Sequence, residues 1–164
     1  MDKQKNYQEP MISDKLIRIL STFFGVGYLP FFPGTWAALL ALIIYLTLRG
    51  YLFFYLLFSF IVVIIGFLVA EGAEKVFQKK DCKFIVIDEL SAALFLYICI
   101  PYSSNFFLLI IAFVLFRIFD IIKPFPIKRI EKLKGSYGIM LDDLAAAVYS
   151  FIGCWIIFYL RGRQ

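Results

Sequence analysis

The sequence predicts an all-α membrane protein, a polytopic helical bundle of four or five membrane helices preceded by an N-terminal interfacial amphipathic helix. Hydrophobic residues make up 62% of the chain and the mean hydropathy is +0.85, whereas soluble domains are about 45–50% apolar. Several apolar runs approach the length needed to cross a bilayer. The 164 residues suggest a single domain, with residues 1–24 as the amphipathic segment and 25–164 as the bundle.

The first predicted helix follows Ser13, a residue type that often caps helices. Apolar residues then recur at helical spacing: Ile12, Leu16, Ile19, Leu20 and Phe23. Lys15 and Arg18 fall on the other side, which is typical of a helix lying on a membrane surface. The same spacing also fits a helix packed in a protein core, so both alternatives stay open. The charges spread through residues 1–18 argue against a signal peptide.

Five apolar segments follow. Tyr51–Ala70 has no charge over twenty residues, and a helix of that length spans about 30 Å, the thickness of the hydrocarbon core. Phe106–Ile122 and Leu144–Leu160 are two further predicted spans. Thr35–Leu48 and Leu90–Ile100 are shorter. We expect the first of these two to cross, while the second fits either a tilted span or a re-entrant segment.

The charged residues are unevenly distributed around these segments. With the N-terminus in the cytoplasm and all five segments crossing, residues 1–34, 71–89 and 117–143 are cytoplasmic. These pieces hold fourteen of the seventeen Lys and Arg residues and all twelve acidic residues. This asymmetry satisfies the positive-inside rule. It predicts an integral protein of the inner (cytoplasmic) membrane whose site faces the cytoplasm. Because the bases flank membrane segments, the net charge of +5 does not suggest nucleic acid.

Acidic and basic motifs stand in or beside the apolar runs, where a charge is costly and usually functional. Asp88-Glu89 and Asp142-Asp143 each precede an apolar run, and Arg117, Asp120 and Lys123 share one face of a predicted helix. Carboxylates suit Mg²⁺, and bases suit phosphate. The sequence thus predicts a membrane enzyme acting on a phosphorylated substrate. Its expected catalytic and Mg²⁺-binding residues are Asp88, Glu89, Asp120, Asp142 and Asp143, and its expected phosphate-binding residues are Arg117 and Lys123.

A further candidate phosphate site lies at Gly34 and Thr35. Pro33-Gly34-Thr35 begins a predicted helix shortly after Gly25-Val26-Gly27. Glycine lets a backbone approach a ligand, and a helix N-terminus attracts anions. The same tripeptide also fits an ordinary helix start.

Structural interpretations compete with the functional one for the charged motifs. Each acidic pair could cap the helix that follows it and interact with the helix dipole. Arg117 and Lys123 could be helix-end residues whose long side chains reach the membrane interface. This alternative explains Lys123 better than it explains the acidic Asp120 on the same helix face. Lys123 precedes Pro124, so the helix is expected to end there.

Several mechanisms are excluded by missing residues. The chain has no histidine, which removes a His nucleophile or base. It also lacks the cysteine–arginine loop of cysteine phosphatases and any Asp-x-Asp nucleophile motif, and its three cysteines have no metal-ligand spacing. Metal-assisted attack by water remains. The alternative from another class is a transporter or lipid-headgroup-binding scaffold that uses buried ion pairs without hydrolysis.

Four motifs occur in a recognisable order. They are Gly25–Gly27 with Pro33-Gly34-Thr35, Asp81 with Ile85–Glu89, Phe116–Ile127, and Gly138–Asp143. Together they resemble the phosphatidylglycerophosphatase A family over roughly residues 20–160. The resemblance implies a Mg²⁺-dependent membrane phosphatase. Its expected substrate is the lipid phosphatidylglycerophosphate, from which it removes the terminal phosphate to give phosphatidylglycerol.

Overall fold

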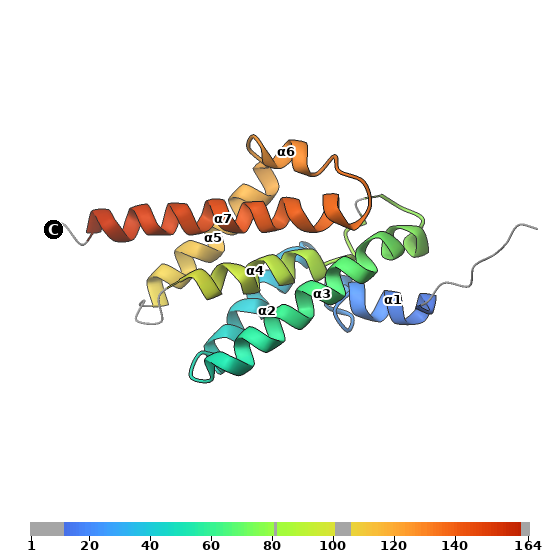
Figure 1. The fold of residues 1–164 in the computed structure, drawn as a ribbon, viewed down its shortest axis with the longest axis horizontal. Helices are drawn as coiled ribbons and strands as arrows, with labels where there is room; N and C mark the ends of the chain where they lie inside the picture. Colours follow the sequence, from blue (N-terminus) through green and yellow to red (C-terminus); the bar gives the residue numbers. More distant parts are fainter. Residues whose placement is uncertain (1–11, 81, 101–105, 162–164) are drawn as a thin grey trace, which may run out of the picture.

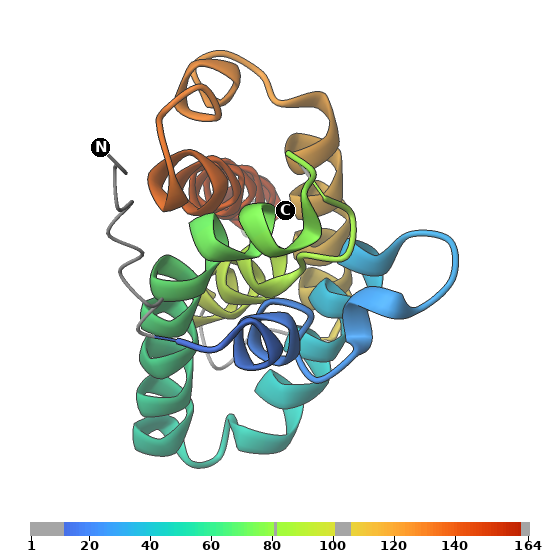
Figure 2. The ribbon, with the colours of Figure 1, turned by 90° about the vertical axis from the view of Figure 1, so that its right-hand side faces the viewer.

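The computed structural model describes residues 12–80, 82–100 and 106–161, and the regular secondary structure of these residues is entirely helical, with no β-strand. This confirms the all-α class. The elements in chain order are α1 (Asp14–Ser21), the short 3₁₀ helix η1 (Val26–Tyr28), α2 (Pro33–Leu48), α3 (Leu52–Phe77), α4 (Ile87–Cys99), α5 (Phe106–Ile122), α6 (Ile127–Ile130) and α7 (Ser136–Arg161). Figures 1 and 2 show the longer helices gathered around α4.

The helices coincide with the predicted apolar segments, but α3 and α7 extend well beyond them. Helix α3 continues past Ala70 to Phe77, and α7 begins at Ser136, eight residues before Leu144. An apolar run marks where a helix needs apolar surroundings, whereas the backbone hydrogen bonds continue through good helix formers such as Ala, Glu and Lys. Helix α5 ends at Ile122 as expected, and Lys123 adopts a left-handed backbone with a φ of 46° before Pro124.

Helix α4 forms the centre of the bundle. Most of its residues are buried, and it packs against α2, α3 and α7. With thirteen residues it is about 20 Å long, shorter than a hydrocarbon core. The apolar character of Leu90–Ile100 therefore reflects burial within the protein.

Two described helices are long and apolar enough to cross a membrane. They are α3, whose most apolar 18 residues have a mean hydropathy of 2.9, and α7, where the corresponding value is 1.7, while α2 is apolar but shorter. Their outward faces carry large apolar side chains such as Phe53, Phe60 and Trp155, each more than half exposed. An apolar exterior of this kind is unusual for a soluble monomer and suits a lipid environment. The expectation of four or five spans stays a prediction.

Helix α1 packs against the bundle. Ser13 caps it by accepting a hydrogen bond from the Leu16 backbone N–H (3.4 Å). Ile17 is buried against Gly72 of α3, whereas Leu16 is 45% exposed. One side of α1 is therefore packed in the protein core, as one of the two alternatives predicted. The opposite side remains available for a membrane surface. Residues 1–11 of the predicted amphipathic segment lie outside the described residues.

The helix order brings the polar motifs to one end of the bundle. Helices α2, α4 and α7 begin there, and α3 and α5 end there. The backbone N–H of Val86 donates to the Ser21 carbonyl oxygen (3.0 Å), which ties the start of α4 to the end of α1. Residues far apart in the sequence can therefore meet in one site.

Candidate active site

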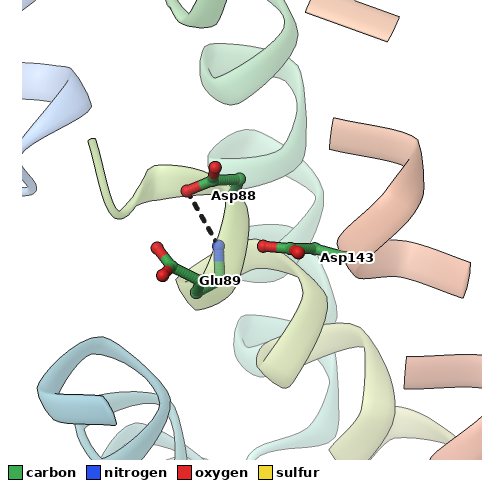
Figure 3. Close-up of side chains that lie close together, drawn as sticks. All are labelled: Asp88, Glu89 and Asp143. Atoms are coloured by element: carbon green, nitrogen blue, oxygen red, sulfur yellow. Dashed lines mark hydrogen bonds between the residues drawn. The ribbon is translucent and has the colours of Figure 1, made fainter. Parts of the chain in front are cut away.

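Three carboxylates from two helices converge at the start of α4. Asp88 and Glu89 stand in the first turn of α4, and Asp143 extends toward them from α7 (Figure 3). One oxygen from each of the three lies within 4.8 Å of the others. Oε2 of Glu89 is buried and has no hydrogen-bond partner among the described residues. Three carboxylates at this spacing, one with an unsatisfied buried oxygen, form a donor set suited to a hard divalent cation.

Asp142, the neighbour of Asp143, has different partners. Its Oδ2 accepts a hydrogen bond from the Lys123 ammonium (2.6 Å), which also donates to Glu131 Oε1 (2.7 Å). The left-handed backbone at Lys123 ends α5 and places this residue between α7 and the segment after α6. Burial by itself lowers the pKa of Lys123, but its hydrogen bonds to Asp142 and Glu131 outweigh this and raise the pKa above its ordinary value. Lys123 therefore stays protonated.

Arg117 forms an ion pair with Asp120, the remaining carboxylate of the predicted set. Its guanidinium lies 2.6 Å from Asp120 Oδ2 and 4.0 Å from Glu89 Oε1. Gly34, in the first turn of α2, lies directly behind this pair, because a Cβ there would overlap the Glu89 carboxylate and come within 3.2 Å of Arg117. Glycine at position 34 thus permits Glu89 and Arg117 to lie against the backbone of α2.

The acidic side chains and Lys123 open onto one cavity of about 370 Å³. Its walls include all five predicted carboxylates and Lys123, together with residues of the loops before α4 and before α7. Arg117 is not among its lining residues. The size falls within the range of small-molecule sites, and the polar lining suits a phosphorylated headgroup.

The carboxylates at the start of α4 strongly affect one another. Burial, followed by the nearby carboxylates Asp142 and Asp120, raises the pKa of Asp88 to about 7. Burial and the neighbouring Asp88 raise the pKa of Glu89 well above its usual range. Negative charges crowded in this way disfavour full ionisation, and a bound cation would reverse that preference.

Most of the residues predicted for the site lie close together in the structure. All five acids, Lys123 and Gly34 lie at the same end of the bundle, with Arg117 behind the cavity wall. The half-buried Thr35 is not among the residues that line the cavity, and its role in phosphate binding stays a prediction. None of the four paired acids occupies an N-cap position, although Asp88 and Glu89 stand in the first turn of α4, where the helix dipole favours a negative charge. Asp142 and Asp143 stand in the second turn of α7, and the cap position of α4 is Val86.

Sequence reasoning missed Glu131 and the exposed lysines that also line the cavity, Lys80, Lys83, Lys132 and Lys134. The available signal was the prolines after Lys123, which reverse the chain and return the segment around Glu131 to the end of α5. The lysines gave no signal of their own, because lysine is common in loops that flank apolar helices.

Comparisons with known proteins point to one family. A family model described as "Phosphatidylglycerophosphatase A" matches residues 19–158. A protein of Bacteroides thetaiotaomicron, provisionally named a phosphatidylinositol-3-phosphatase, is 39% identical over 82% of this chain and 88% of its own length. Proteins named phosphatidylglycerophosphatase A are 37% identical in Haemophilus influenzae (87% of this chain, 89% of that protein) and 32% identical in Escherichia coli (80% and 77%). No solved structure matches the chain.

Proposed function

The chain belongs to the phosphatidylglycerophosphatase A family and is a lipid phosphatase, and from this premise we propose that it hydrolyses the terminal phosphomonoester of phosphatidylglycerophosphate in a Mg²⁺-dependent reaction. Water attacks the terminal phosphorus, the phosphorus–oxygen bond to glycerol breaks, and the products are phosphatidylglycerol and inorganic phosphate. Family membership disfavours the alternative of a transporter or a headgroup-binding scaffold.

The observation that carries the proposal is the meeting of Asp88, Glu89 and Asp143 in one polar cavity. These three carboxylates would hold Mg²⁺, and the buried, unpartnered Oε2 of Glu89 supports that assignment. When bound, Mg²⁺ offsets charge on the phosphoryl oxygens and lowers the pKa of a water molecule. The predicted ligands Asp120 and Asp142 instead pair with Arg117 and Lys123, so we assign them to positioning these cations.

Lys123 and Arg117 have different proposed roles. Lys123 lines the cavity and can donate to a phosphate oxygen while it holds Asp142 and Glu131. Arg117 fixes Asp120 and Glu89 from behind the cavity wall. Because Arg117 does not line the cavity, the phosphate contact predicted from the sequence stays a prediction, and we assign Arg117 to positioning these two carboxylates.

Phosphate release by the purified full-length chain tests the proposal. We expect turnover of phosphatidylglycerophosphate that stops in excess chelator and returns with Mg²⁺. Phosphatidylinositol 3-phosphate is assayed in parallel, because a relative carries that activity in its provisional name. Full activity in chelator would refute the metal assignment. Release of phosphate from phosphatidylinositol 3-phosphate alone would replace the proposed substrate.

We also propose that the site faces the cytoplasm, on the basis of the asymmetry of basic residues. In a background without native cysteines, single cysteines at Lys79 and Lys132 should react with an impermeant reagent only from the cytoplasmic side. A cysteine at Arg49 should react only from outside. Labelling of positions 79 and 49 from the same side would contradict this topology.

A further inference from the structure

The cavity has two zones of opposite charge. The buried and half-buried carboxylates of α4, α5 and α7 are here called its floor, and the exposed lysines that also line it are called its rim: Lys80 and Lys83 from the loop before α4, and Lys132 and Lys134 from the loop before α7. These loops lie about fifty residues apart in the sequence. The fold brings two lysines from each to the mouth of one cavity.

The four rim lysines differ from the two cations of the site. Lys123 and Arg117 are already paired with carboxylates. The rim lysines are exposed, and none of them forms an ion pair with a described residue, although Glu74 shares the rim. Their positive charge is therefore available to a ligand, as a flexible set of ammonium donors suited to phosphate.

The loop before α7 is held against the cavity by close backbone packing. A Cβ at Gly138 would overlap the carbonyl oxygen of Leu133 and come within 2.9 Å of that of Glu131. This contact keeps the segment that carries Lys132 and Lys134 at the start of α7. Asp142 and Asp143 follow one turn further along the same helix, so rim and floor have a fixed relation.

The substrate proposed above contains two phosphates of different kinds. The terminal phosphomonoester is hydrolysed, whereas the phosphodiester that joins the headgroup to the lipid keeps one negative charge and remains in the product. The proposed cation site at the floor would offset the charge of the monoester. A monoester positioned at the floor leaves the diester nearer the mouth, where the lysines stand.

We propose that Lys80, Lys83, Lys132 and Lys134 form a second anion site that binds the phosphodiester of the lipid headgroup. This site makes the enzyme select lipids that carry a diester in addition to a terminal monoester. The inference rests on the proposed function for the identity of the monoester. It assigns a specificity role to residues outside the catalytic cluster.

The test compares two lipids with the same acyl chains. Phosphatidylglycerophosphate carries both phosphates, whereas phosphatidic acid carries a monoester alone. For Lys132→Gln/Lys134→Gln, and separately for Lys80→Gln/Lys83→Gln, we expect kcat/KM on phosphatidylglycerophosphate to fall about tenfold, mainly through KM. Turnover of phosphatidic acid should change less than about twofold because it offers no diester.

A matched control separates this site from general attraction of basic residues to anionic lipid. Lys79→Gln/Lys128→Gln removes the same charge from neighbouring exposed positions that do not line the cavity. It should leave the ratio of the two kcat/KM values unchanged. The second anion site is refuted if the rim variants lower kcat/KM equally for the two lipids. It is also refuted if the control variant lowers the ratio of the two kcat/KM values as much as the rim variants do.

A binding measurement keeps this inference distinct from the proposed reaction. Glycerophosphoglycerol, a soluble diester without a monoester, should bind the wild-type chain about tenfold more tightly than the rim variants. Binding that depends on the lysines, in a chain that hydrolyses neither lipid, would support the anion site and refute the proposed function. If the chain hydrolyses phosphatidylglycerophosphate but binds the soluble diester equally well with and without the lysines, the proposed function is supported and the anion site is refuted.

Discussion

The two acidic pairs look alike in the sequence and share one local geometry, yet they differ in use. In each pair the backbone N–H of the second acid donates to Oδ1 of the first, at 3.0 Å. Asp88 and Glu89 both turn to the three-carboxylate cluster. Asp142 and Asp143 separate, because Asp143 joins that cluster while Asp142 pairs with Lys123.

The difference arises from where each pair stands on its helix. Asp88 and Glu89 occupy the free first turn of α4, where both side chains can reach the same space. Asp142 and Asp143 lie within the body of α7, each only 4% exposed. Consecutive residues point about 100° apart in both helices, but on α7 this angle turns Asp142 to Lys123 and Asp143 to the cluster. An acidic pair in a sequence is therefore no guarantee of two ligands.

The largest effect should come from removing a member of the cluster. Asp143→Asn or Asp88→Asn keeps the side-chain size but loses a charge, and we expect activity to fall at least about a hundredfold. Thermal stability in chelator should stay equal or rise, because one repelling carboxylate is gone. Asp14→Asn, the same change at an exposed position in α1, is the control. Near-normal turnover of both variants would remove the metal assignment.

The contact behind the α4 pair should come next. Arg117→Lys keeps the charge but loses the planar guanidinium that spans Asp120 and Glu89. We expect kcat/KM to fall about tenfold to a hundredfold, or about 1.4–2.7 kcal/mol. Helical content measured by circular dichroism should stay constant. If even Arg117→Ala keeps near-normal turnover, Arg117 is only a helix-end residue that reaches the membrane interface.

Asp142→Asn sharpens the comparison because its expected profile is the opposite of that of Asp143→Asn. Loss of the ion pair with Lys123 should lower the free energy of unfolding by about 1 kcal/mol. Activity should fall only about tenfold, since the cluster is intact. Thermal melts in chelator and phosphate release measure the two quantities. Equal activity losses at positions 142 and 143, with equal stability, would show that both acids of α7 do the same work.

The smallest effect is expected at Gly34. In Gly34→Ala the new Cβ must displace the Glu89 carboxylate, and a shift of this kind should lower kcat about fivefold. The end of a side chain can move cheaply, so the melting temperature should change little. The variant should also need a higher Mg²⁺ concentration for half-maximal activity. An unchanged Mg²⁺ dependence would show that Gly34 does not influence the carboxylate cluster.

The sequence by itself determined the helices and the identity of the charged residues. Apolar runs located α2, α3, α5 and α7 because burial in protein or lipid leaves a lasting compositional mark. The acids, Lys123 and Gly34 were recognisable because charges and glycine are unexpected beside such runs. The pattern could not separate a lipid-facing helix from a buried one. Only packing showed α4 to be the central helix of the bundle.

The tertiary structure decided which partner each charge receives. Whether Asp142 joins a cluster or an ion pair depends on where Lys123 lies after α5 ends, and that is a contact across nineteen residues. The rim lysines can be recognised as one group only because the fold brings two distant loops to the same cavity. Electrostatic interactions fall off over a few ångströms and depend on burial, so they follow from the arrangement of the helices in space and leave no periodic signal in the sequence.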